Sequence, residues 1–164
     1  MKERYLSKVE VNFNLYGIFE EETAIVKDWL YSSYLILDEN LMVKESSAYK
    51  IERSKEIIKY EFKKEFIDFI EKHHKERVKR WDLIGSLHSH PERRCRFEGY
   101  KECNPSANCF SEIDLFGALV ISIIREMVGK SPTHLSIVYC EPEDKYVAIL
   151  YPGNHLVDLE IKNL

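Results

Sequence analysis

Apolar and polar residues alternate over residues 9–16, the first stretch of the chain with a clear pattern. Its apolar positions on one side are Val9, Val11, Phe13 and Leu15. A period of two is typical of a β-strand that is buried on one face. Residues 17–19 can continue this strand, the glutamates at 20–22 suit a turn, and residues 23–30 are predicted to form the antiparallel return. The sequence therefore predicts an N-terminal β-hairpin.

A helical period replaces this alternation between residues 54 and 79. Apolar residues there recur at steps of three and four, and Ser54 is suited to cap the first turn. These apolar positions are Ile58, Phe62, Phe66, Phe69 and Ile70. Two short segments before them, 34–37 and 41–43, are candidate strands. We expect a long amphipathic helix that follows the first strands.

The second half of the chain alternates strand and helix patterns. An apolar run at 83–87 predicts a buried strand, and a second apolar run at 115–127 has the length of a helix. Gly129, followed by Pro132, ends that helix. Closing strands are predicted at 134–140, 146–151 and 156–161. This order predicts an α+β or α/β/α layered domain, in which a mixed sheet is flanked by the long helix and by the helix of the C-terminal half.

Candidate metal ligands lie where the strand at 83–87 ends. His88 and His90 are two residues apart, so they leave the strand on the same face, and Pro91 favours the end of the strand just after them. Asp114 opens the following helix and can bring a carboxylate to the same place. Two imidazoles and one carboxylate suit zinc, with a fourth tetrahedral position left for water. Each fragment also has a structural explanation, since such histidine pairs occur by chance and Ser111 with Asp114 forms a capping-box-like helix start.

Composition narrows the functional classes. With 164 residues and 45% hydrophobic content, the chain fits a single domain, residues 1–164, with its own core. The formal net charge of −4 lacks the basic surplus of a nucleic-acid-binding protein, so no nucleic-acid partner is expected. No apolar stretch resembles a targeting segment or a membrane span, so we expect a cytoplasmic protein without a membrane partner. The four cysteines are not required as disulfides in a chain with this apolar content.

The run His88-Ser89-His90-Pro91, followed by Ser111-Glu112-Ile113-Asp114, resembles the signature of the JAMM metalloproteases, the catalytic MPN domains. The pattern of that family is a glutamate on an early strand, then His-x-His-Pro, then Ser-x-x-Asp. In several members a glycine ends the glutamate strand seven residues later, and Glu10 with Gly17 has that spacing. The order of the predicted elements also agrees. The resemblance covers most of the chain and implies the MPN fold.

The resemblance implies a zinc-dependent isopeptidase or peptidase. His88, His90 and Asp114 would hold Zn²⁺, and Glu10 would be the general base toward a zinc-activated water. Ser111 would donate a hydrogen bond to the developing oxyanion. The implied substrate is a bond after the C-terminal tail of ubiquitin, or of a ubiquitin-like or sulfur-carrier protein.

Other residues compete for two of these roles. A strand glutamate more often faces solvent, and without the spacing to Gly17 the acidic turn Glu20-Glu21-Glu22 would be an equal source of the general base. Ser89 and Ser106 are further hydroxyls near the motif. They rank below Ser111, because Ser89 should point away from its neighbouring histidines and Ser106 lacks the three-residue step to the aspartate.

The chain departs from the family pattern between its two motifs. Twenty residues separate His90 from Ser111, so an insertion at about 92–109 must loop out beside the metal. Three cysteines of this insertion could be free thiols, form one disulfide or bind a second metal. They are Cys95, Cys103 and Cys109. The alternative hypothesis is therefore a non-catalytic or autoinhibited MPN-like scaffold that binds a ubiquitin-like partner, and formation of a homodimer stays open.

Overall fold

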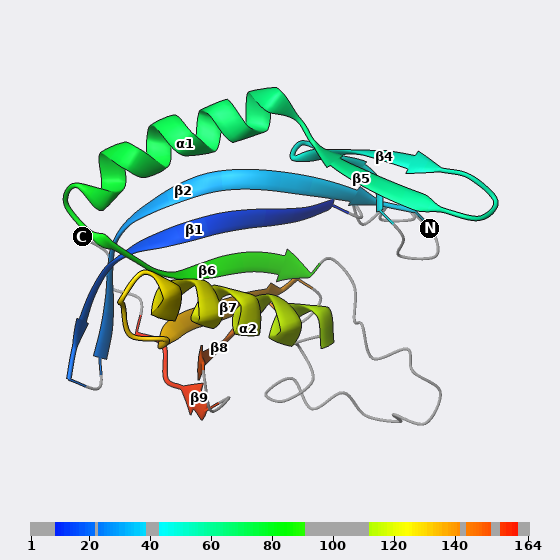
Figure 1. The fold of residues 1–164 in the computed structure, drawn as a ribbon. Coiled ribbons are helices and arrows are strands. Elements are labelled where there is room, and N and C mark those ends of the chain that lie inside the picture. The colour runs from blue at the N-terminus through cyan, green and yellow to red at the C-terminus, as the bar shows by residue number, and fades with distance from the viewer. Residues whose placement is uncertain are drawn as a thin grey trace.

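The computed structural model describes residues 9–21, 23–38, 43–90, 112–141, 144–151 and 155–160, and Figure 1 shows the fold. The described strands are β1 (Val9–Glu20), β2 (Thr23–Leu37), β3 (Val43–Ser46), β4 (Tyr49–Arg53), β5 (Ile58–Phe62), β6 (Asp82–His90), β7 (His134–Cys140), β8 (Lys145–Tyr151) and β9 (His155–Val157). The described helices are α1 (Lys64–Val78) and α2 (Glu112–Met127). The described residues form a mixed α+β fold, as the sequence predicts, and they contain more strand than helix.

Most of the strands belong to one sheet, in the order β3-β2-β1-β6-β7-β8-β9, and β4 and β5 form a separate pair. Neighbouring strands of the large sheet are antiparallel except β6 and β7, which are parallel. A parallel pair needs a crossover connection of about a dozen residues or more, and the segment that holds α2 supplies it. The end of β6 and the start of α2 therefore lie at the same end of the sheet.

The prediction of a long helix that starts at Ser54 is wrong. The helix α1 begins at Lys64, and the residues before it form the β4–β5 hairpin. The Ser54 hydroxyl accepts the backbone N–H of Ile57 (3.1 Å), so it closes the hairpin turn and caps no helix. Ile58 and Phe62 lie four residues apart, a step that suits one face of a helix and also one face of a strand. The apolar pattern alone could not separate the two structures.

Other boundaries differ less. The strand β2 runs unbroken where two strands, 23–30 and 34–37, are predicted, because its pairing with β1 continues across an irregularity between Asn12 and Phe13. The strand β9 is shorter than the predicted 156–161. Of the strand predicted at 41–43, the first two residues lie outside the described residues, and β3 begins at Val43.

The first helix contacts the face of the sheet that carries His88. Opposed residues of neighbouring strands share a face, so this face includes Asn12 of β1 and Val138 of β7. Tyr16 lies on the same side of β1 as Asn12, four residues along the strand. Its hydroxyl is 2.9 Å from Nδ1 of His74, on α1. The helix α1 therefore packs over the β1 side of this face.

The second helix contacts the same face. His134 lies on the same side of β7 as Val138, and its Nδ1 is 3.2 Å from the hydroxyl of Ser122, on α2. Both helices thus cover the face that carries His88. This arrangement fits the α+β alternative of the prediction and not the α/β/α layering, in which each face of the sheet has a helix.

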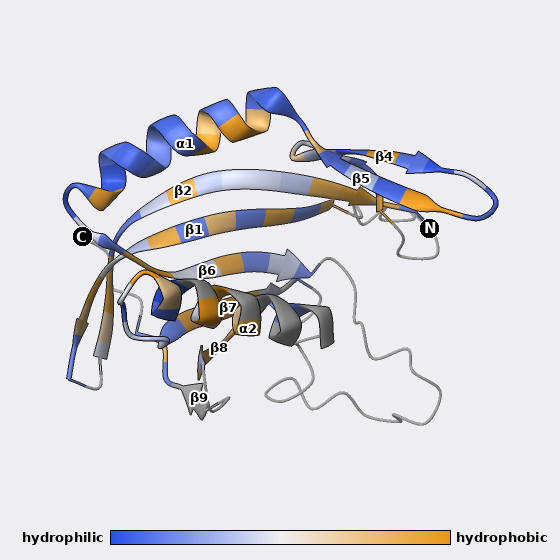
Figure 2. Cartoon of the chain, viewed as in Figure 1, coloured by the Kyte–Doolittle hydropathy of each residue, from blue (hydrophilic) through white to orange (hydrophobic). Residues whose placement is uncertain are grey.

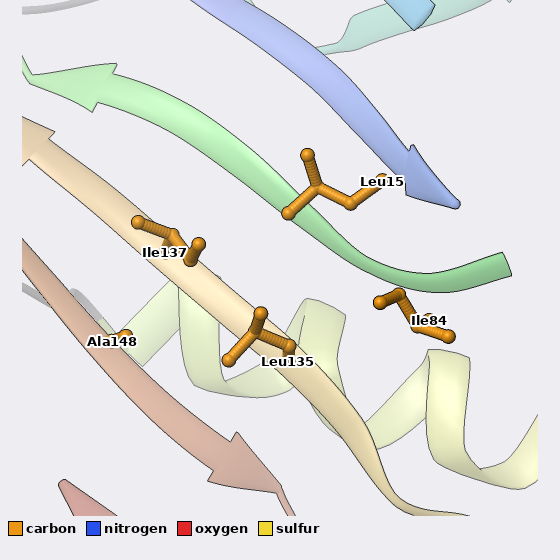
Figure 3. Close-up of a cluster of buried hydrophobic side chains, with 5 residues drawn as sticks. All are labelled: Leu15, Ile84, Leu135, Ile137 and Ala148. Carbon is orange, nitrogen blue, oxygen red and sulfur yellow. The ribbon is translucent and has the colours of Figure 1, made fainter. Parts of the chain in front are cut away.

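The main hydrophobic cluster is spread over β1, β6, β7 and β8, and Figure 3 shows its side chains. Its members are Leu15, Ile84, Leu135, Ile137 and Ala148. Leu15 precedes Tyr16 on β1 and therefore points to the face without the helices. Phe19 and Ala24, from the far ends of β1 and β2, pack against the cluster. The end of the β1–β2 hairpin thus helps to cover this second face.

The surface of α1 is largely hydrophilic, as Figure 2 shows, and none of its residues is fully buried. Neither described helix is long and apolar enough to cross a bilayer.

Candidate metal centre

The two motif histidines lie at the end of β6. They face the same side of the strand, and their partners on β7 are Val138 and Cys140. The two Nε2 atoms are 3.0 Å apart, and the ring centroids are 4.8 Å apart. His90 is almost fully buried, and the side chain of His88 keeps 14% of its exposure. Both imidazoles therefore direct the same ring nitrogen toward one point near the surface.

Asp114 reaches this point from the first turn of α2, which begins at Glu112. One carboxylate oxygen lies 3.1 Å from Nε2 of His88, and the other lies 3.4 Å from Nε2 of His90. One ligand atom from each of the three residues can be chosen so that all lie within 4.8 Å of one another. The structure thus brings together the three metal ligands predicted from the sequence.

The separations of these atoms fit a single ion. With bond lengths of about 2.0–2.1 Å, two ligands of a tetrahedral zinc ion lie about 3.3–3.4 Å apart. The two Nε2 atoms are 3.0 Å apart, and they lie 3.1 and 3.4 Å from two different oxygens of Asp114. Two imidazole nitrogens and a carboxylate are also a donor set that zinc accepts. The residues present therefore fit the metal that the sequence motif implies.

The charge of Asp114 depends on the same contacts. Burial alone would raise the pKa of its carboxyl group, but hydrogen bonds from His88 and His90 and the electrostatic attraction of these imidazoles outweigh burial and lower that pKa below its usual range. The carboxylate is thus held in its charged form, which is the form that binds a cation.

Glu10 lies on β1, the strand next to β6. Asn12 is opposite His88 in the last pair of β1 with β6, and Glu10 lies two residues further along β1 on the same side of the strand. Glu10 is 6% exposed, so the expectation that a strand glutamate faces solvent does not hold for it. Glu20 and Glu21, two of the alternatives, are exposed at the far end of the β1–β2 hairpin, and Glu22 lies outside the described residues. Glu10 is therefore the better placed carboxylate.

Several predicted features fall outside the described residues. They are Ser111, Ser106, the insertion at 92–109 and its cysteines Cys95, Cys103 and Cys109. Ser89 is described, and its side chain is buried between strands, where its hydroxyl accepts the backbone N–H of Val11 (3.0 Å). This contact agrees with the prediction that Ser89 points away from its neighbouring histidines.

Sequence reasoning missed the residue that fastens α2 to β6. Arg125 is 6% exposed, and its guanidinium donates to the carbonyls of Ser131 and Leu83 and to the carboxylate of Asp82. The same carboxylate accepts a hydrogen bond from Lys130 (2.6 Å). A signal was available, because Arg125 is one of only two charged residues, with Glu126, in the mostly apolar run at 115–127.

Comparisons with known proteins add no assignment. A scan against models of protein families finds no match, and a search of curated proteins finds no similar sequence. The residues and their geometry are therefore the basis for a functional assignment.

Proposed function

We propose that this protein is a zinc-dependent metallopeptidase of the JAMM type, built on an MPN-like fold. The observation that carries the proposal is the convergence of Nε2 of His88, Nε2 of His90 and the carboxylate of Asp114 at separations of 3.0–3.4 Å. Chance pairing of histidines on a strand gives no reason for a carboxylate to arrive from a helix more than twenty residues later in the chain. A common ion accounts for all three positions.

The proposed chemistry is hydrolysis of a peptide or isopeptide bond. A zinc ion held by these three residues would activate a water molecule and polarise the carbonyl of the substrate. Glu10 is the general base: its carboxylate takes a proton from the attacking water and delivers a proton to the leaving amine. Its place on the neighbouring strand, on the face of His88 and His90, supports this role. Ser111 is assigned to the oxyanion on its motif position alone.

The proposed substrate class rests on the motif resemblance. It is a bond after the C-terminal tail of ubiquitin, or of a ubiquitin-like or sulfur-carrier protein.

Metal analysis is the first test. The purified full chain is expected to hold about one zinc ion per molecule, and His88→Ala and Asp114→Asn are expected to lose it, because a site with two protein ligands binds zinc weakly. His73→Ala is the matched control, since His73 lies on α1 and outside the site. A chain without stoichiometric zinc, with the same metal content after His88→Ala, would contradict the proposal and favour the non-catalytic scaffold.

Hydrolysis of fusions to ubiquitin and to ubiquitin-like proteins is the second test. Glu10→Gln keeps the size of the side chain but removes the base, so kcat is expected to fall by about a hundredfold or more while zinc stays bound. Glu76→Gln, at an exposed position of α1, should leave kcat unchanged. Turnover that survives Glu10→Gln would remove Glu10 from the mechanism.

A further inference from the structure

The seam between β1 and β6 opens beside the candidate metal centre. Cross-strand pairing of these two strands runs from Gly17 with Asp82 to Asn12 with His88 and ends there. Both strands continue beyond this pair, β1 to Val9 and β6 to His90. The two strands therefore form no further cross-strand pairs at the level where Glu10 and His90 lie.

The outer side of each strand stays paired over the same stretch. Val9 still pairs with Ile36 of β2, and His90 still pairs with Cys140 of β7. The opening is thus confined to the seam that separates Glu10 from the two histidines. Where strand pairing ends, a backbone N–H that points into the sheet needs another acceptor, because a buried N–H without a partner is costly.

Ser89 bridges this gap. It lies between the two histidines, is 3% exposed, and its hydroxyl accepts the backbone N–H of Val11 at 3.0 Å. In a regular antiparallel ladder that N–H would meet a backbone carbonyl of the neighbouring strand. A side-chain oxygen reaches further from its own backbone than a carbonyl oxygen does, so the bridge keeps Val11 in place without closing the seam.

We propose that Ser89 is a positioning residue for Glu10, an inference that rests on the proposed function. By holding the N–H of Val11, Ser89 fixes the segment of β1 next to Glu10 and therefore the distance between the Glu10 carboxylate and the histidine pair. Without the hydroxyl, β1 would shift against β6 and the base would be misplaced. The three zinc ligands lie on β6 and α2, so their convergence does not depend on this bridge.

Kinetics of the full chain with zinc and a ubiquitin-like fusion provide the test. For Ser89→Ala we expect unchanged zinc stoichiometry, nearly unchanged KM and a kcat lower by about a hundredfold, the effect of a misplacement of about 1 Å. Thr at this position retains a hydroxyl and Val of the same size does not, so Ser89→Thr should keep much more activity than Ser89→Val. Equal activity of these two variants would overturn the proposal.

A double-mutant cycle separates positioning of Glu10 from a general structural role. If Ser89 acts through Glu10, Ser89→Ala should slow the Glu10→Gln protein no further. If the two losses multiply, Ser89 acts by another route and the proposal fails. This readout is independent of global stability, provided that both proteins are folded at the assay temperature.

Amide exchange keeps the inference testable if the proposed function is wrong. In the folded wild-type chain the N–H of Val11 should be protected, and Ser89→Ala should speed its exchange by about tenfold, while the N–H groups of the paired part of β1 stay protected. Absence of turnover in the zinc-loaded wild type would reject the peptidase proposal alone. Unchanged protection of Val11 in Ser89→Ala would reject the role of Ser89.

Discussion

The replacement Arg125→Ala should destabilise the fold strongly, because it removes a buried charged side chain. The Arg125 guanidinium is buried at 6% exposure and donates to Ser131 (2.8 Å), to Leu83 and to Asp82 (3.2 Å). Alanine would leave these acceptors without their donor in a place that water reaches poorly. Because α2 carries Asp114 at its other end, the same contacts hold the helix that completes the candidate metal centre.

The expected loss can be bounded from these contacts. Breaking a buried ion pair costs about 3–5 kcal/mol, and the low end applies because Asp82 is one-third exposed and keeps its bond to Lys130. For a chain of this length, about 3 kcal/mol corresponds to a fall in Tm of about 6–12 °C. Lys130→Ala removes the exposed partner of the same carboxylate, and it should cost only about 0.5 kcal/mol.

Urea unfolding and differential scanning calorimetry of the two variants beside the wild type measure both quantities. Arg125→Met is a useful third variant, since it keeps much of the apolar stem and removes the donors. Two results would contradict this prediction: a cost of less than about 1 kcal/mol for Arg125→Ala, or an equal cost for Lys130→Ala and Arg125→Ala. Either result would mean that burial of the guanidinium does not govern this contact.

Three further predictions concern stabilisation by zinc, the pH dependence of stability and the replacement of two glycines. Zinc at about a hundred times its Kd should stabilise the wild type by about 2.7 kcal/mol, seen as a rise in Tm that Asp114→Asn abolishes; an equal rise in that variant would place the ion elsewhere. Burial and the charge of Arg125 lower the pKa of His134 and outweigh the opposite effect of the Pro132 carbonyl. Below about pH 6.5 the unfolded chain therefore binds a proton at this histidine more readily than the folded chain, and the free energy of unfolding decreases as the pH is lowered. His134→Asn should flatten the pH dependence of Tm in that window, and an unchanged slope would contradict the assignment. A Cβ on Gly85 would overlap the carbonyl of Leu135, so Gly85→Ala should prevent stable folding. A Cβ on Gly129 would meet no atom within 4 Å, so Gly129→Ala should cost only the strain of its positive φ, about 1–2 kcal/mol. Chemical unfolding of the two variants measures this difference.

Elements whose patterns have one interpretation could be predicted without knowledge of the fold. Alternation fixed β1, a short apolar run followed by two histidines fixed β6, and Gly129 with Pro132 marked the end of α2. The ligand set His88, His90 and Asp114 was also predictable, because strand ends and helix starts are recognisable in a sequence. Their convergence follows once the parallel β6–β7 pair requires α2 as a crossover.

Where a local pattern has two interpretations, contacts between distant segments made the choice. Residues four apart suit a helix and a strand alike, so cross-strand pairing had to establish that Ile58 and Phe62 belong to β5. Strand pairing put Glu10, which is buried, on the strand next to the two histidines, and it brought the Ser89 hydroxyl to the N–H of Val11. The burial of Arg125 likewise depends on what packs around it. Pairing and packing join residues far apart in the chain, and a local pattern holds no information about such partners.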